Sequence, residues 1–329
     1  MRARLVALGL IAGVALAGCS GAPAPEGSAS VSASAPAPAS ASAAPASELD
    51  CDSLLPVSRA SEALRLPADR LEGSRDGAVR SSAELIRAAA EENGGLLTCS
   101  WFETDGPASV VASAAEDAAD AFAALPAGPA LAAGDAASGS CTDGGCTAQV
   151  LVGSTWVSLA LTGAPTALDL AALASATADS ASGRLDEVVA GSGPVCADLL
   201  TTEQLTSLAG LVQPTPGAGT EGAPITTAGA AAAARAGYTS CTWTDAADAA
   251  YSGISVDALP SGEEGWRTLS LTTGLAIPLS PVDGLGERAI SGCSAGTCEV
   301  DVLADGVWWR VLVTGDSARA DSVARAVLD

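Results

Sequence analysis

Residues 286–315, GERAISGCSAGTCEVDVLADGVWWRVLVTG, decide the expected fold because a second stretch matches them without a gap. Residues 134–163 read GDAASGSCTDGGCTAQVLVGSTWVSLALTG, with the cysteines, one tryptophan and the final Thr-Gly in register. Further upstream, Cys51 and Cys196 open the similar segments CDSLLP and CADLLT, 196 − 51 = 145 residues apart. A repeat of this length is domain-sized, so the pattern indicates a tandem duplication and not a solenoid.

Each matched stretch predicts three antiparallel strands. Residues 298–304 alternate between apolar side chains and others, the pattern of a half-buried strand. Asp305-Gly306 is a strong signal for a two-residue hairpin turn, and Gly153-Ser154 occupies the same position in the other stretch. We therefore expect strands near 136–141, 146–152 and 155–162, and near 288–293, 298–304 and 307–313.

Similar elements are expected before and after each stretch. A cysteine and a short helix come first, then a strand with the second cysteine and a tryptophan, a further strand and a helix; another helix closes each repeat. The fold class is therefore α+β: two tandem repeats, each an antiparallel sheet with helices packed on one face and stapled by disulfides. The expected domains are 49–190 and 191–329. The expected outer elements lie near 58–66, 96–103, 108–113, 115–125 and 167–180, then 201–208, 238–244, 253–259, 262–271 and 318–328.

Eight of the nine cysteines form two matching sets of four. An exported chain permits disulfides, and the four-residue spacers TDGG and SAGT are rich in turn-forming residues. Neither the C-x₂-C knuckles of a zinc site nor a redox C-x-x-C motif occurs, so we expect no metal. The predicted disulfides are Cys51–Cys99, Cys141–Cys146, Cys196–Cys241 and Cys293–Cys298.

The first 18 residues predict a secretory signal peptide, with Arg2 and Arg4 before the apolar run 5–17. That run is shorter than the about 20 residues of a membrane-spanning helix. It ends in Leu-Ala-Gly-Cys, which resembles the lipobox of bacterial lipoproteins and implies lipid, palmitate included, on Cys19. We expect a protein anchored at the outer face of the cytoplasmic membrane. An ordinary signal peptide with an incidental cysteine is the alternative.

Residues 19–48 predict a lipidated tether. The segment is almost wholly Ala, Ser, Pro and Gly, which cannot bury a hydrophobic core. We expect a spacer that holds an acidic globule away from the membrane. Whether its serines carry glycans is left open.

Composition excludes several kinds of chemistry. The chain has 15 arginines, no lysine and no histidine, and its formal charge is 15 − 38 = −23. Without histidine or lysine there is no Ser-His-Asp site, P-loop lysine or Schiff base, and no imidazole metal ligand. The negative charge opposes binding to nucleic acids. We expect no cofactor and no catalytic residue.

Paired carboxylates are the remaining candidates for catalysis. The pairs are Glu91-Glu92, Glu263-Glu264, and Asp301 with Asp305. Adjacent acids on a helix point apart and usually form a solvated face. Asp301 lies beside a hairpin turn, so we expect it to be exposed. The sequence therefore favours a protein that is not an enzyme.

Two tryptophans are candidates for ligand binding. Trp309 follows Trp308 on a predicted strand, so the two side chains must point to opposite faces of the sheet. Trp309 either packs beneath a helix or at the domain interface, or it lines a groove for a glycan, lipid or peptide, where aromatic anchors are common. Trp266 has no clear counterpart in the first repeat and is the weaker candidate.

Short motifs give a family resemblance. They are CADLL at 196–200, Cys-Thr-Trp at 241–243, Gly-Leu-Gly-Glu-Arg-Ala at 284–289 and Val-Leu-Val at 311–313. The chain resembles actinobacterial exported lipoproteins of unknown function, whose domains are similar in general form to the extracellular sensor domains of some kinases. The resemblance is weaker in the first repeat and implies no catalytic residues. It implies an envelope domain with room for a ligand between helix and sheet.

These features predict a membrane-anchored, non-catalytic module of the cell envelope that binds a ligand or partner. A structural or scaffolding protein without a small ligand is the alternative, and a carboxylate-dependent glycan hydrolase is a more distant one. The partners expected are the membrane, through Cys19, and an envelope glycan, lipid or protein.

Overall fold

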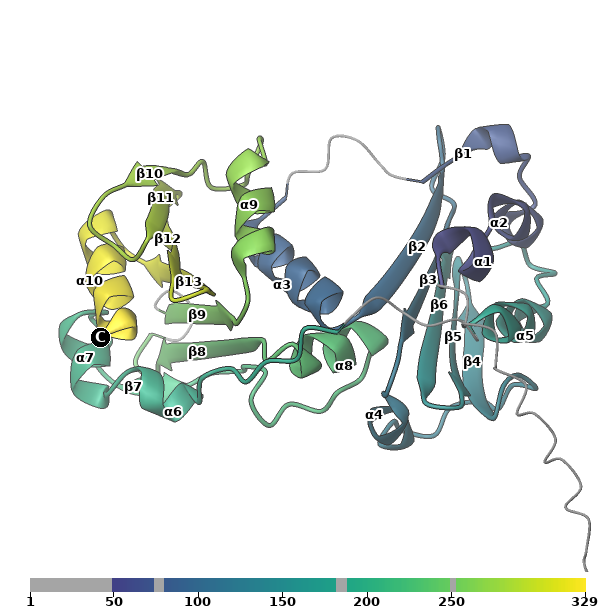
Figure 1. The fold of residues 1–329 in the computed structure, drawn as a ribbon, viewed down its shortest axis with the longest axis horizontal. Helices are drawn as coiled ribbons and strands as arrows, with labels where there is room; N and C mark the ends of the chain where they lie inside the picture. Colours follow the sequence, from purple (N-terminus) through teal and green to yellow (C-terminus); the bar gives the residue numbers. More distant parts are fainter. Residues whose placement is uncertain (1–48, 74–79, 182–187, 249–252) are drawn as a thin grey trace, which may run out of the picture. The chain divides into compact units, whose positions relative to one another are not determined.

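The structure is a computed structural model that describes residues 49–73, 80–181, 188–248 and 253–329. The signal peptide, the tether and Cys19 lie outside these residues, so their assignments stay predictions. Residues Pro45–Asp329 belong to one compact unit. The fold class is α+β, with two antiparallel sheets and helices packed around them (Figure 1).

The first sheet has six strands in the order β1-β2-β3-β6-β5-β4. All neighbouring strands are antiparallel, and β4, β5 and β6 form the predicted meander. The strand bounds are Leu71–Glu72 for β1, Leu96–Glu103 for β2, Ser109–Ala115 for β3, Ala136–Thr142 for β4, Gly145–Val152 for β5 and Thr155–Thr162 for β6.

The second sheet has seven strands in the order β10-β11-β12-β13-β9-β8-β7, again all antiparallel. Its β12–β13 hairpin turns at Asp305 and Gly306, both with positive φ, as a tight turn of this kind requires. The bounds are Pro214–Pro216 for β7, Thr239–Asp245 for β8, Gly253–Leu259 for β9, Ser280–Val282 for β10, Arg288–Ser294 for β11, Thr297–Ala304 for β12 and Val307–Thr314 for β13.

Helices lie before, between and after these strands. Those before residue 190 are α1 (Cys51–Leu54), α2 (Val57–Leu64), the 3₁₀ helix η1 (Ala68–Arg70), α3 (Ser82–Asn93), α4 (Ala119–Ala123) and α5 (Leu170–Ser180). Those after it are α6 (Cys196–Leu199), α7 (Thr202–Ser207), α8 (Ala228–Arg235), α9 (Glu263–Leu271) and α10 (Ser317–Leu328). The helix expected at 115–125 is shorter than predicted because Ala115 still belongs to β3.

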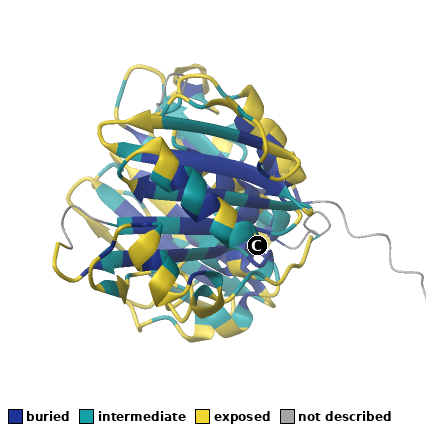
Figure 2. Ribbon diagram, turned by 90° about the vertical axis from the view of Figure 1, so that its left-hand side faces the viewer, coloured by how far each residue is buried: buried dark blue, intermediate teal, exposed yellow. Residues whose placement is uncertain are grey.

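One face of each sheet packs on helices from its own half of the chain. In the first sheet, buried residues of β3, β5 and β6 join a core with α1, α2 and α5. In the second sheet, β9, β12 and β13 join a core with α7 and α10. Figure 2, which looks at the second sheet's side of the molecule, shows mostly buried strands beneath more exposed helices and turns.

The prediction that helices cover only one face of each sheet is wrong. The opposite face, called the exchange face here, packs on a helix from the other half of the chain. Helix α3 lies against β9 and β13 of the second sheet, and α8 lies against β2, β3 and β6 of the first. The physical reason is that both faces bury large side chains: Trp156 shares a hydrophobic cluster with Ala228 and Ala232, and Trp308 shares one with Ile86.

Helices α3 and α8 also pack against each other (Figure 1). Gly94, just after α3, comes so near to Ala232 of α8 that an added Cβ would lie 1.9 Å from its carbonyl oxygen. Arg235 strengthens the contact by donating a hydrogen bond to the Gly94 carbonyl at 3.2 Å. Each exchanged helix therefore contacts both the foreign sheet and the other exchanged helix.

Candidate functional site

The four predicted disulfides are all present. Cys51–Cys99 ties α1 to β2, and Cys196–Cys241 ties α6 to β8. Cys141–Cys146 and Cys293–Cys298 each join directly opposed residues of a hairpin. These cysteines staple the fold, and within the described residues no three His, Cys, Asp or Glu side chains are placed so that they could hold a metal ion.

The tryptophans lie on opposite faces, as expected. Trp308 is fully buried on the exchange face of the second sheet, whereas Trp309 is half-buried against the core on the other face. Trp266 of α9 is buried and packs edge-on against Trp308, with ring centroids 6.3 Å apart. Core packing accounts for Trp266 and Trp309, neither of which lines the groove described below. Their ligand role stays a prediction without support from these contacts.

The expectation that Asp301 is exposed is wrong. Its side chain is fully buried, while Asp305 in the turn is exposed. Asp301 is directed to the exchange face, where α3 and α9 exclude water from the strand. Glu92, Glu263 and Glu264 are exposed, so the structure brings none of the three predicted pairs together as two facing acids in an open cleft.

Asp301 belongs to a buried charged cluster, which we define as Ser82, Asp257, Glu299, Asp301 and Arg310. Arg310 lies at its centre. Its guanidinium donates to Asp257 Oδ2 at 2.9 Å, to Glu299 Oε2 at 2.7 Å and to Ser82 Oγ at 2.7 Å. Ser82 in turn donates to Glu299 Oε1. Because buried charges are stable only when paired and hydrogen-bonded, these contacts explain how Arg310 is tolerated in the core.

Asp301 differs from the other members because no cation contacts it directly. The Trp308 indole donates to Asp301 Oδ1 at 2.8 Å, while Oδ2 has no donor among the described residues. The carboxylate of Glu299, on the same strand, interacts with the Asp301 carboxyl group. Burial, and then the charge of Glu299, raise the pKa of Asp301 well above its ordinary value. Asp301 therefore ionises only at a higher pH than an ordinary aspartate, and in its protonated form it can donate a hydrogen bond to Glu299.

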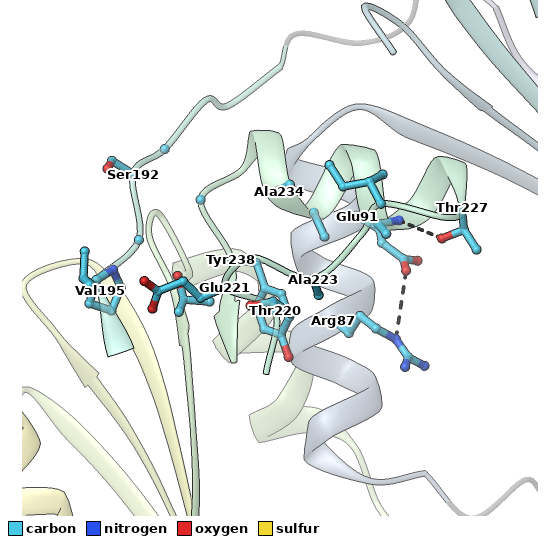
Figure 3. Close-up of a pocket in the computed structure, with 18 of the residues that line it drawn as sticks. Arg87, Glu91, Ser192, Val195, Thr220, Glu221, Ala223, Thr227, Ala234 and Tyr238 are labelled. Atoms are coloured by element: carbon cyan, nitrogen blue, oxygen red, sulfur yellow. Dashed lines mark hydrogen bonds and ion pairs between the residues drawn. The ribbon is translucent and has the colours of Figure 1, made fainter. Parts of the chain in front are cut away.

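A groove of about 670 Å³ opens beside the exchanged helices (Figure 3). Arg87 and Glu91 reach it from α3, and Ala230, Ala233 and Ala234 line it from α8. Residues 191–195 and 220–227 supply the remaining walls together with Tyr238 and Thr239. This volume lies within the range of about 300–1,000 Å³ that is typical of ligand pockets.

The walls of the groove are mostly apolar, with a few charged groups. Val195 is an exposed large apolar residue, 48% accessible, and lies across the groove from Glu91 in Figure 3. Glu91 is 29% exposed, and its nearest cation is the Arg87 guanidinium, 4.0 Å away. Burial raises the pKa of Glu91, and Arg87 opposes that shift only in part. Glu221 adds a second carboxylate and accepts the backbone N–H of Cys196.

The backbone is fitted closely around this groove. Gly191 donates to the Arg235 carbonyl at the end of α8, and Val189 donates to the Asn93 carbonyl at the end of α3. An added Cβ on Gly193 would lie 2.1 Å from the Gly237 carbonyl oxygen, so a larger residue would push the segment away. The groove is therefore built on the two exchanged helices.

Tyr238 connects the groove to the charged cluster. Its ring lines the groove, and its hydroxyl donates to Asp257 Oδ1 at 3.0 Å. Burial, and then the charge of Asp257, raise the pKa of Tyr238, so it stays a neutral donor. Helix α3 makes a second connection, because Ser82 at its first turn joins the cluster and Glu91 at its last turn reaches the groove.

Sequence reasoning missed the groove because it missed α3 and α8. Signals for both helices were present. Ser81 and Glu84 form a capping box before α3, whose buried residues have helical spacing, and Gly94-Gly95 follow it. Thr227 caps α8, which ends before Gly237. Because both helices are rich in alanine, their sequences show little alternation between large apolar and polar residues at helical spacing.

No helix within the described residues has the length and apolar character needed to span a membrane. Comparison of the chain with family models, with curated proteins and with solved structures finds no match.

Proposed function

We propose that the chain is a tandem duplication of one α+β domain, with the boundary near residue 190. The corresponding strands in the two sheets follow the same order, β1-β2-β3-β6-β5-β4 and β7-β8-β9-β13-β12-β11. The disulfides repeat as well, with sequence separations of 48 and 5 in the first half and 45 and 5 in the second. Shared strand order and shared cross-links support descent from one ancestral unit.

We propose that the protein is held at the outer face of the cytoplasmic membrane by lipid on Cys19, with residues 19–48 as a spacer. The basic start, apolar run and lipobox-like Leu-Ala-Gly-Cys motif support this location. Four disulfides are compatible with an oxidising compartment. Two acyl chains on the cysteine would give stable anchoring, since a single chain gives only marginal binding.

We propose that this anchored protein is a non-catalytic binding module, and that its ligand occupies the groove between α3, α8 and residues 191–195. The observation that carries this proposal is a groove of about 670 Å³ with mostly apolar walls and a half-buried carboxylate, Glu91. Such a combination is typical of ligand sites, where apolar contact supplies affinity and a few polar groups set orientation.

The groove fits an amphipathic ligand with a positively charged group. Its apolar walls would receive a hydrocarbon or apolar side chain, and Glu91 and Glu221 offer carboxylates to an ammonium or guanidinium group. The nearest cation to Glu91 is 4.0 Å away, which leaves the carboxylate incompletely paired. The net charge of −23 further favours a cation over an anion.

Native mass spectrometry of the protein purified from its own envelope tests occupancy, because a bound molecule adds mass that denaturation removes. Calorimetry then tests the ligand class with dodecyltrimethylammonium, dodecyl sulfate and dodecyl maltoside, each below its micelle concentration. We expect the cationic probe to bind most tightly. Equal affinity for all three, or preference for the sulfate, would contradict the assignment of a cationic ligand.

Matched variants locate the site. Glu91→Gln should weaken the cationic probe about tenfold, while Glu92→Gln, the next residue along the same helix and outside the groove, should not. Ala234→Phe adds bulk inside the groove at an exposed position and should abolish binding; Ala318→Phe on α10 is its control. Undiminished binding to Ala234→Phe would exclude the groove as the site.

A further inference from the structure

The charged cluster lies where an exchanged helix docks. Asp257, Glu299, Asp301 and Arg310 come from β9, β12 and β13, whereas Ser82 comes from the first turn of α3. Ser82 is the member through which α3 joins the cluster, and it bonds both Glu299 and Arg310. The rest of the docked surface of α3 is apolar, with Leu85, Ile86, Ala89 and Ala90 buried.

The charge balance of this cluster depends on one proton. With Asp301 protonated, two carboxylates face one guanidinium, and the positive end of the α3 dipole lies at Ser82 beside Glu299. If Asp301 ionises, a third buried carboxylate is added with no cation in contact. Among the charged groups around it, Glu299 has the largest effect on Asp301, so the added repulsion falls on the residue that Ser82 binds.

We propose that the charged cluster and α3 form a proton-dependent latch. Helix α3 docks fully on the second sheet while Asp301 is protonated, and α3 loosens from that sheet when Asp301 loses its proton. Helix α3 also carries Arg87 and Glu91 into the groove, so the latch sets the shape of the ligand site. This last consequence rests on the proposed function of the groove; the docking of α3 does not.

The groups around Asp301 support this direction of response. Glu299 lies on the same strand as Asp301, Arg310 lies on the neighbouring strand β13, and Asp257 lies on β9 beyond it. The neutral hydroxyls of Tyr238 and Ser82 complete the surroundings. The remaining charged residues of the packed helices and of β11 are partly or fully exposed, so water screens them: Glu84, Arg87, Glu91 and Glu92 on α3, Glu263, Glu264 and Arg267 on α9, and Arg288 on β11. Arg310 is therefore the cation available to the cluster, and it is already paired with the carboxylates of Asp257 and Glu299.

Hydrogen exchange of the full-length protein tests the latch. Protection of the amides in residues 85–93 is measured from about pH 5 to about pH 9, with each rate divided by its intrinsic rate at that pH. We expect protection of α3 to fall with rising pH once Asp301 titrates, by up to about tenfold per pH unit. Peptides from α10 should keep their protection, which separates local loosening from global unfolding.

Asp301→Asn is the matched variant, because the amide can still accept the Trp308 N–H and can donate to Glu299 without a titrating proton. Protection of α3 in this variant should stay constant with pH. Constant protection of α3 in the wild-type protein would overturn the latch even if the variant failed to fold. An equal fall in wild type and variant would also overturn it.

Ligand binding distinguishes the latch from the groove function. The wild-type affinity for dodecyltrimethylammonium should fall as α3 loses protection, and the affinity of Asp301→Asn should not. If α3 responds to pH but the probe binds nowhere, the latch stands and the proposed ligand fails. If the probe binds while protection of α3 is constant, the groove function stands and the latch fails.

Discussion

The exchange face of each sheet buries a tryptophan whose indole N–H needs a hydrogen-bond acceptor, and the two acceptors differ in their chemistry. On the first, the Trp156 indole donates to Gln149 Oε1 at 2.6 Å. On the second, the Trp308 indole donates to Asp301 Oδ1 at 2.8 Å. In both cases the acceptor lies seven residues before the tryptophan on the neighbouring strand. The amide satisfies the indole at any pH, whereas the acid satisfies it while keeping a proton of its own.

The neighbours of these acceptors differ in the same way. Across from Gln149 lie Ser158 and then Ser113, whereas across from Asp301 lie Arg310 and then Asp257. The serines are half-buried and the charged residues are buried. The second face is covered by α3 with 12 residues and α9 with 9, whereas the first is covered by α8 with 8 and α4 with 5. The comparison teaches that the polar row under the longer helices is the one that is fully buried and that carries paired charges.

The largest expected loss of stability distinguishes the two exchange faces at corresponding positions, Arg310 in the second sheet and Ser158 in the first. Arg310→Leu removes the cation and leaves Asp257 and Glu299 buried without it, which should cost about 3–5 kcal/mol in the free energy of unfolding. Ser158→Ala, at the corresponding position of the first sheet, should cost less than about 1 kcal/mol. Urea denaturation measures both. Similar losses would mean that the cluster does not stabilise the second sheet.

The two long disulfides, one in each half of the chain, should contribute nearly equal amounts to the free energy of unfolding. Replacing Cys51 and Cys99 by alanine should cost about 4 kcal/mol by the loop-entropy relation, since 48 residues separate them. The pair Cys196 and Cys241, separated by 45 residues, should cost the same within about 0.5 kcal/mol. Thermal and urea unfolding of the two double variants check this. A large difference would show unequal strain or unequal unfolded-state structure.

Exchanging the acceptors should move a pH dependence from one sheet to the other. The raised pKa of Asp301 means that the native protein holds an extra proton above about pH 3.8, so its stability should fall as pH rises towards that pKa. Asp301→Asn should remove this slope, which can reach about 1.4 kcal/mol per pH unit. Gln149→Glu should introduce a smaller slope, because that site is half-buried. Urea midpoints against pH would show a contradiction if Asp301→Asn kept the slope.

The smallest effects concern the caps of the exchanged helices. Ser81 caps α3 in a reciprocal capping box with Glu84, and Thr227 caps α8 by accepting the Ala230 N–H. Ser81→Ala and Thr227→Ala should each cost about 1 kcal/mol, with Ser81 the larger because two hydrogen bonds are lost. Denaturation midpoints measure the difference. A larger loss for Thr227 would show that α8 depends more on its cap than α3 does.

The sequence predicted the strands and cross-links well because local patterns determine them. Alternation over 298–304, the Asp305-Gly306 turn and the paired cysteines led to the meander and to all four disulfides. The two stretches around Trp156 and Trp308 also reinforced each other. A pattern that occurs twice in one chain is stronger evidence than either copy alone.

The exchange and the site could not be predicted because they depend on long-range packing. Nothing local to α3 specifies which sheet it covers, and Ser82 meets Arg310 across 228 residues of sequence. The missing helix also explains the wrong expectation for Asp301, which was predicted to be exposed because it lies beside the Asp305-Gly306 turn. The polar face of its strand is buried by α3, a helix that the sequence analysis did not predict.

The exchange of α3 and α8 has a consequence for how the chain folds as it emerges N-terminus first. Trp156, which packs edge-on against Phe122 of α4, lacks its cover from α8 until residues 228–235 follow, and α3 precedes β13 of its sheet by more than 200 residues. Contacts of such long range are slow to form and expose apolar surface meanwhile. Neither half completes its core alone, so unfolding should be a single cooperative transition, and a nascent chain released early would be an easy substrate for proteases.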